Sequence, residues 1–171
     1  MNPGPDNTDQ TDPTEQIGTV DARLEVLGIR LPGPYPPHDP LDAVVVHGGR
    51  ARTSGQLPRG HDGRLVHPGV VGSTIDVEQG AECALWCALN ALSVLRAELG
   101  SLDRIERVLT VIGFVACAPG FEKQPAVIDG ASRLLHEVFG DAGRHTRSAI
   151  GVAALPRGGA VEIEVEVAIR E

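Results

Sequence analysis

Two charged residues near the end of the chain, Arg147 and Glu162, have the side chains best suited to chemistry on a small molecule. A guanidinium group can bind a carboxylate through two parallel hydrogen bonds, and the small Ala149 leaves room beside Arg147. Glu162 could orient or deprotonate a water molecule, and His145 stands two residues before Arg147, where it could touch the same ligand. The simpler alternative is that Arg147 pairs with a surface acid and that the alternating glutamates of 162–166 form a solvated strand face.

The cysteine and serine residues are weaker candidates. Cys83 and Cys87 are four residues apart in an apolar segment, and no histidine or cysteine stands near them at metal-ligand spacing. We therefore expect both thiols to pack in the core, and we expect no metal site. Ser54, Ser73 and Ser148 lack the sequence context of an activated nucleophile, so a serine hydrolase has no support.

Two alternating segments predict the strands that would carry the charged pair. In 161–169, valine and isoleucine alternate with glutamate, so one face is apolar and Glu162 lies on the other. In 147–153, the apolar residues, Ile150 among them, are predicted to face the core, which places Arg147 on the opposite face. If both apolar faces meet one core, Arg147 and Glu162 share the outer face of the sheet.

The remaining segments predict an α+β fold. Leucines at helical spacing indicate helices, and Gly48 with Gly49 supplies a tight hairpin turn. A β-branched run indicates a strand covered on both faces. Two helices on one face of a mixed sheet make a two-layer sandwich, and oligomerisation is the simplest cover for its other face. In chain order we expect a short helix within 17–29, a hairpin over 43–54, a helix over 76–99, a strand over 107–116 and a helix over 123–139.

Length and composition exclude several classes of function. The chain has 171 residues and a mass of 18.0 kDa, so we expect a disordered acidic tail over 1–16 and a single domain over 17–171. The net charge of −8 comes without a basic cluster, and only 3% of residues are aromatic, so nucleic-acid binding is not expected. No segment has the character of a signal peptide or a membrane span, so we expect a cytoplasmic protein with reduced thiols.

Residues 41–170 resemble the RidA family, also called YjgF or L-PSP endoribonuclease-like. The most specific element is a C-terminal signature in which fifteen positions separate Arg147 from Glu162. The segments that carry the resemblance are Ser54–Pro58, Asn90 with Leu99–Asp103, Leu135–Gly140, Arg147–Ser148, Leu155–Pro156 and Val161–Glu164.

The resemblance implies a chorismate-mutase-like fold and a homotrimer with ligand clefts between its subunits. It also implies that Arg147 binds a substrate carboxylate and that Glu162 acts on water. The implied reaction is the hydrolysis of a reactive 2-imino acid to a 2-oxo acid and ammonia, which needs no cofactor. The positions implied to contact the substrate, besides Arg147, are Ala149, Ser54, Gly55, Phe121 and Tyr35.

Three departures indicate a divergent subgroup. Ala149 stands where the deaminases often have cysteine, Ser132 stands where their second helix usually has asparagine, and Tyr35 lies eight residues before Ala43 instead of the usual three. Three hypotheses therefore remain: an imine deaminase, a non-catalytic trimer that binds a small carboxylated metabolite, and, less favoured, an endoribonuclease.

Overall fold

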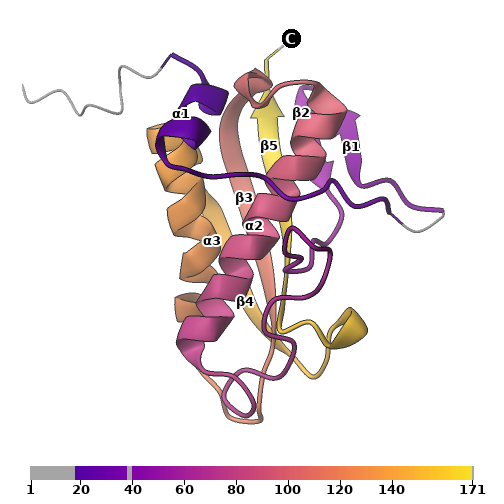
Figure 1. Cartoon of the computed structure of the whole chain (residues 1–171), viewed down its shortest axis with the longest axis vertical. Coiled ribbons are helices and arrows are strands. Elements are labelled where there is room, and N and C mark those ends of the chain that lie inside the picture. The colour runs from indigo at the N-terminus through magenta and orange to yellow at the C-terminus, as the bar shows by residue number, and fades with distance from the viewer. Residues whose placement is uncertain (1–17, 38–39, 171) are drawn as a thin grey trace, which may run out of the picture.

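Three α-helices and five strands make up the part of the chain that the computed structural model describes, residues 18–37 and 40–170 (Figure 1). Each predicted element is present with bounds close to those expected, whereas the predicted tail over 1–16 lies outside the described residues. In chain order the elements are α1 (Val20–Val26), β1 (Val44–His47), β2 (Arg50–Thr53), α2 (Val77–Leu99), β3 (Ile105–Ala116), α3 (Gln124–Phe139), β4 (Thr146–Val152) and β5 (Val161–Ile169).

The strands form one mixed sheet in the order β1-β2-β5-β3-β4. β3 and β4 run parallel, and the other neighbouring pairs are antiparallel. Helices α2 and α3 lie side by side across one face of the sheet, and α1 packs near one end of α3 (Figure 1). The structure thus confirms the predicted mixed sheet with two helices on one face. No helix in the described part of the chain is long and apolar enough to cross a membrane.

The core lies between the sheet and the two long helices. Along β5, Val161, Ile163, Val165 and Val167 are fully buried, as the alternation in the sequence predicts. The leucine stripe of α2 meets this face, and α2 packs against both β5 and α3. Burial of these side chains, each contributing about 1.5–3 kcal/mol relative to exposure, holds β5 in a defined register. The glutamates that alternate with them must therefore point away from the helices.

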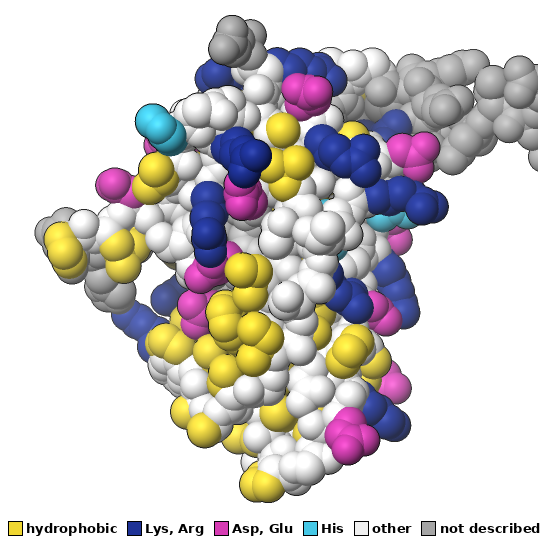
Figure 2. Space-filling view, turned by 180° about the vertical axis from the view of Figure 1, so that it is seen from behind, with side chains coloured by type: hydrophobic (Ala, Val, Ile, Leu, Met, Phe, Trp, Pro, Cys, Tyr) yellow, Lys and Arg dark blue, Asp and Glu magenta, His cyan; other side chains and the backbone are white. Residues whose placement is uncertain are grey.

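The other face of the sheet is uncovered in the single chain. Val111 and Val115 of β3 are fully buried under the helices, whereas Ile112 and Phe114 on the opposite side are only half-buried. The expectation that β3 is covered on both faces is therefore wrong within one chain, because no described segment crosses the second face. Figure 2 shows hydrophobic side chains gathered in one area of this open face, beside a region where basic and acidic side chains are interspersed.

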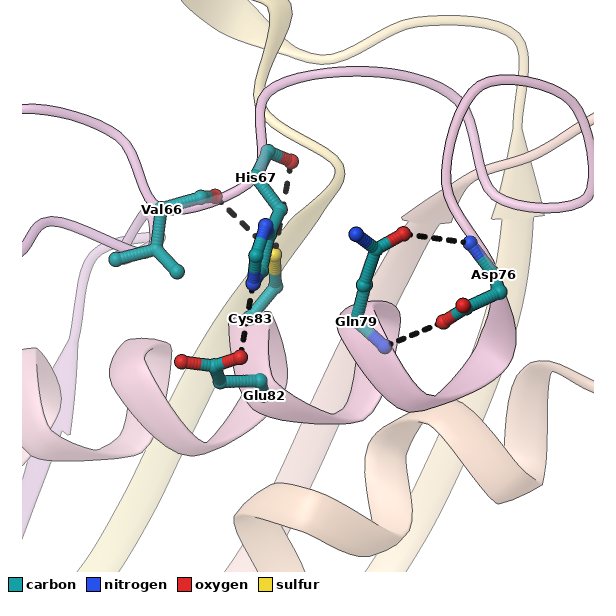
Figure 3. Close-up of polar contacts among 6 residues, drawn as sticks. All are labelled: Val66, His67, Asp76, Gln79, Glu82 and Cys83. Carbon is teal, nitrogen blue, oxygen red and sulfur yellow. Dashed lines mark hydrogen bonds and ion pairs between the residues drawn. The ribbon is translucent and has the colours of Figure 1, made fainter.

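The start of α2 is fixed by its own side chains. Asp76 accepts a hydrogen bond from the backbone N–H of Gln79 at 2.8 Å, and the Gln79 side chain accepts one from the backbone N–H of Asp76 at 3.0 Å (Figure 3). This reciprocal capping box satisfies two backbone donors that the helix cannot pair itself. Gly100 ends the helix at a φ of 80°, where its missing Cβ avoids strain.

The same end of α2 fastens the long loop that precedes it. His67 of this loop contacts Glu82 at 2.8 Å between Nε2 and Oε2, and the Cys83 thiol donates to the Val66 carbonyl at 3.2 Å (Figure 3). Burial raises the pKa of the Cys83 thiol to about 12, so this cysteine is no thiolate nucleophile. Cys83 and Cys87 are both fully buried, which confirms that they pack in the core.

Candidate functional site

Glu162 lies in a cleft on the open side of the sheet. The cavity has a volume of about 280 Å³, and Tyr35, Ser54, Gly55 and Arg157 also line it. Four of the residues expected at the site are therefore brought together by three separated segments of the chain. The Tyr35 hydroxyl donates to the Gly60 carbonyl at 2.5 Å, so its ring is held at the cleft in spite of its unusual distance from β1.

Gly55 is the position that allows Glu162 to sit where it does. A Cβ on Gly55 would lie 1.8 Å from the Glu162 carboxylate oxygen Oε1. The loop is fixed at this point, because Gln56 and Ile163 exchange backbone hydrogen bonds of 2.8 and 3.1 Å. Only glycine therefore leaves space for the carboxylate beside the backbone at residue 55.

The three glutamates of β5 have different surroundings. Glu164 pairs with Arg52 at 2.6 Å and Glu166 pairs with Arg50 at 3.1 Å, whereas Glu162 has no hydrogen-bond or ion-pair partner among the residues described. Burial raises the pKa of the Glu162 carboxyl, and the nearby charge of Glu164 raises it further. A half-buried carboxylate with a raised pKa and a free side is suited to accept a proton from water.

Arg147 lies elsewhere, against helix α3. Its Nη1 donates to Asp129 Oδ1 at 2.8 Å and to Ser132 Oγ at 3.1 Å. The side chain is 23% exposed, so the guanidinium is held by α3 and still reaches the surface. Ala149, two residues further along β4, packs against the hydrophobic core. The sequence analysis missed both α3 partners, although Asp129 and Ser132 are three apart and so share one face of that helix.

The register of the sheet places Arg147 and Glu162 on opposite faces. Phe114 of β3 pairs with Glu162 on one side and with Ile150 on the other, so these three side chains share the open face. Arg147 stands three positions before Ile150 in β4, and an odd separation along a strand puts two side chains on opposite faces. Arg147 therefore points to the face covered by helices, as its contacts with α3 show. The prediction of a common face is therefore wrong. It assumed that Ile150 faces this chain's own core, whereas Ile150 is 43% exposed.

The last expected contact residue, Phe121, lies apart from both groups. It follows β3 and packs beside Gly72, where a Cβ would come within 2.8 Å of its ring. The expected site residues thus occupy three places in one chain: the Glu162 cleft, the Arg147 position on β4, and the Phe121 turn. Within residues 18–37 and 40–170, no group of three or more histidine, cysteine or acidic side chains could hold a metal ion.

A family model described as "YjgF/chorismate_mutase-like, putative endoribonuclease" matches residues 21–161. The chain belongs to this family. The resemblance seen in the sequence is thereby confirmed, together with the fold that it implied.

This YjgF-like chain is similar to three further proteins along most of its length. Protein TCP17 of Trypanosoma cruzi is 42% identical over 151 residues, which are 88% of this chain and 94% of that protein. The crystal structure of Atu1372, a protein of unknown function from Agrobacterium tumefaciens, has a TM-score of 0.81 and 39% identity, covering 88% of this chain and 92% of that one. The crystal structure of a protein from Shewanella oneidensis MR-1, described as a "putative endoribonuclease", has a TM-score of 0.85 and 28% identity. The match covers 89% of this chain and 100% of that one.

Proposed function

We propose that this protein is a RidA-type deaminase that hydrolyses reactive 2-imino acids to 2-oxo acids and ammonia. The observation that carries the proposal is the Glu162 carboxylate, which is half-buried, has no partner in the described residues and lies in a cleft against Gly55. A structural glutamate on this strand would be expected to pair with an arginine, as Glu164 and Glu166 do.

The site is proposed to form between subunits of a homotrimer. Within one chain, Arg147 and Glu162 point to opposite faces of the sheet and cannot hold the same small molecule. β4 is an edge strand, so Arg147 stands at the border of the molecule and could approach the Glu162 cleft of a neighbouring copy. The apolar area on the open face gives the subunits a surface to bury on assembly. Its residues are Ile112, Phe114, Ile150 and Val152.

Arg147 is proposed to bind the substrate carboxylate. Nη1 is engaged by Asp129 and Ser132, whereas Nη2 and Nε make no hydrogen bond within the described chain. These two nitrogens form the edge of the guanidinium that matches the two oxygens of a carboxylate. The bonds to α3 orient that edge before the ligand arrives, which lowers the entropy lost on binding.

Glu162 is proposed to activate the water that attacks the imine carbon. The carboxylate takes a proton from water as the new C–O bond forms, and it returns that proton to the nitrogen. The C–N bond then breaks, ammonia leaves, and the carboxylate takes the remaining hydroxyl proton as the C=O bond of the 2-oxo acid forms; this proton then passes to the released ammonia. A protonated imine carbon is already electrophilic, so orientation and one proton carrier suffice. The raised pKa of Glu162 improves its match to both steps.

A second candidate is a trimer that binds a small carboxylated metabolite without turning it over. Two observations favour it: Ala149 provides no thiol beside Arg147, and the guanidinium charge is already balanced by Asp129. An endoribonuclease, the activity in the family's description, is disfavoured because the chain has a net charge of −8 and no basic cluster in its sequence to neutralise phosphates.

The deciding experiment measures 2-oxo acid release from freshly generated imino acids of several sizes. Glu162→Gln keeps the shape of the side chain and removes the proton acceptor, so turnover should fall about 10²- to 10⁴-fold. Glu166→Gln is the matched control on the same strand and face, and it should stay close to the parent. Release that is absent from the parent protein with every imino acid would favour the non-catalytic binder, and equal turnover in Glu162→Gln would exclude the proposed role.

A further inference from the structure

A serine, a histidine and a backbone carbonyl form a hydrogen-bonded chain beside Arg147. His145 Nδ1 lies 2.6 Å from the Gly143 carbonyl oxygen, and His145 Nε2 lies 3.0 Å from Ser132 Oγ. A carbonyl oxygen can only accept, so Nδ1 carries the hydrogen and the neutral ring presents Nε2 as an acceptor. The Ser132 hydroxyl therefore donates to His145. Nucleophile, base and orienting group are arranged in this order in hydrolases that use a serine.

Arg147 supplies a positive charge at the same oxygen. Its Nη1 donates to Ser132 Oγ at 3.1 Å, and the same nitrogen donates to Asp129 Oδ1 at 2.8 Å. A fixed cation next to a hydroxyl stabilises the oxygen as it loses its proton. The same charge would also favour the oxyanion that forms when this oxygen attacks an acyl carbon.

The surroundings keep His145 in the form that a base requires. Burial lowers the pKa of the imidazole, the bond to Gly143 opposes that shift, and the charge of Arg147 lowers the pKa further. The ring is therefore neutral at pH 7 and free to take a proton. His136, the other histidine nearby, is turned to the Gly140 carbonyl at 2.9 Å and does not compete for Ser132.

An open cavity gives a substrate access to these groups. It has a volume of about 330 Å³, and Ser132, Gly143, Arg144, His145 and Arg147 line it with His136. Arg144 pairs with Asp141 at 3.4 Å and Arg147 Nη1 pairs with Asp129 at 2.8 Å, and the remaining N–H groups of the two guanidinium groups can bind a substrate that carries a carboxylate. Within one chain, Glu162 and its cleft are not part of this cavity.

We propose that Ser132 is a nucleophile and His145 its general base, and that this second site hydrolyses small esters whose acyl group carries a carboxylate. Ser132 Oγ bonds to the acyl carbon as its proton passes to His145 Nε2. The ester C–O bond then breaks, and the alcohol leaves with that proton. Water attacks the acyl-serine, gives its proton to His145, and releases the acid as Ser132 takes the proton back. This site shares Arg147 with the imine hydrolysis proposed above, whereas its nucleophile and base, Ser132 and His145, have no part in that reaction.

Covalent labelling of the full chain tests the nucleophile. The protein is incubated with a fluorophosphonate probe, and the labelled peptide is identified by mass spectrometry. The label is expected on Ser132, and it should be lost in Ser132→Ala and kept in Ser73→Ala, which changes an exposed serine of a loop. Alanine is the residue most favourable to a helix, so Ser132→Ala should keep its fold, which circular dichroism verifies. An unlabelled parent protein, or a label on another residue, overturns the proposal.

Ester hydrolysis tests the base and the charge preference. 4-Nitrophenyl acetate is compared with the mono-4-nitrophenyl ester of succinic acid, and the succinyl ester is expected to react at least about tenfold faster because of Arg144 and Arg147. In His145→Asn, the side-chain amide can still donate to Gly143 but offers no base, so the rate should fall about 10²-fold or more. His47→Asn, on exposed β1, serves as the control. A His145→Asn protein as fast as this control would overturn the assignment of the base.

Discussion

Arg147 and Glu162 stand on two strands that flank β3, and their side chains leave the sheet through opposite faces. Both residues belong to one C-terminal signature, separated by fifteen positions. One small ligand cannot contact both within a single chain, since the sheet lies between them. If both act on one substrate, the site must combine Arg147 of one subunit with Glu162 of another.

The first prediction concerns assembly. Light scattering after gel filtration should give three times the chain mass of 18.0 kDa. Ile150→Glu should shift the protein towards the monomer, because a carboxylate would then have to be buried among apolar side chains of the open face. Val26→Glu changes a residue of α1 that is 72% exposed and should leave the mass unchanged. A monomeric parent protein at micromolar concentration would contradict this expectation.

Binding should depend on the shape of the Arg147 side chain as well as its charge. Arg147→Ala should weaken the binding of a 2-oxo acid by roughly ten- to a hundredfold, since one charge-assisted hydrogen bond contributes about 1.5–3 kcal/mol. Arg147→Lys should be intermediate, because an ammonium group cannot make two parallel bonds. Arg133→Ala removes an exposed arginine of α3 that also contacts Asp129, at 3.9 Å, and provides the control. Titration calorimetry compares all four proteins, and equal affinities would place the ligand elsewhere.

Gly55→Ala should remove activity without removing the fold. The new methyl group would fall 1.8 Å from Glu162 Oε1, so the carboxylate must move out of its place in the cleft. Overpacking of this kind costs about 1–3 kcal/mol, and a half-exposed side chain can relieve part of it by moving. Gly18→Ala is the matched control, because nothing lies within 4 Å of its added Cβ. Imine hydrolysis and melting temperature are measured together, and full turnover in Gly55→Ala would show that the position of Glu162 is unimportant.

The raised pKa of Glu162 predicts two effects of pH. Because the ionised carboxylate is the base, kcat/KM should fall as the pH decreases through this pKa, at a higher pH than for an ordinary glutamate. The folded protein holds the Glu162 proton more tightly than the unfolded chain does. Glu162 therefore contributes to stability at pH values below its pKa in the unfolded chain, and this contribution is lost as the pH rises through its pKa in the folded protein. Glu162→Gln should accordingly be at least as stable as the parent at pH 7, with the difference shrinking in acid. Thermal melts at several pH values measure this difference in stability. A Glu162→Gln protein that is less stable than the parent at pH 7 but not in acid would contradict the raised pKa of Glu162.

The elements of the fold could be predicted because local patterns determine them. The alternation along β5 corresponds to one buried face, and the leucine spacing of α2 predicts the helix correctly, although all residues of 87–95 are buried. The facing of β4 could not be predicted in the same way. Ile150 is apolar and yet lies on the open face, where it is 43% exposed, so the rule that apolar residues point to the core of their own chain failed there.

Individual residues of the candidate site could be predicted from the sequence, but their positions relative to one another in space could not. Tyr35 and Gly55 were expected near Glu162, and the structure brings them to its cleft. The contacts of Arg147 with Asp129 and Ser132 depend on how α3 packs over β4, which no spacing in the sequence specifies. The space that Gly55 leaves for Glu162 likewise depends on the pairing of Gln56 with Ile163 across the sheet.

The most direct measurement of the shared site is subunit complementation. Arg147→Ala and Glu162→Gln chains carrying different affinity tags are co-expressed, purified through both tags, and assayed for 2-oxo acid release beside each variant alone. Purification through both tags removes the two homotrimers, and in each mixed trimer one interface pairs an intact Arg147 with an intact Glu162 of the neighbouring subunit. Activity should therefore recover to about a third of that of the parent. Mixed trimers that stay as inactive as either variant alone would show that the two residues do not meet across a subunit interface.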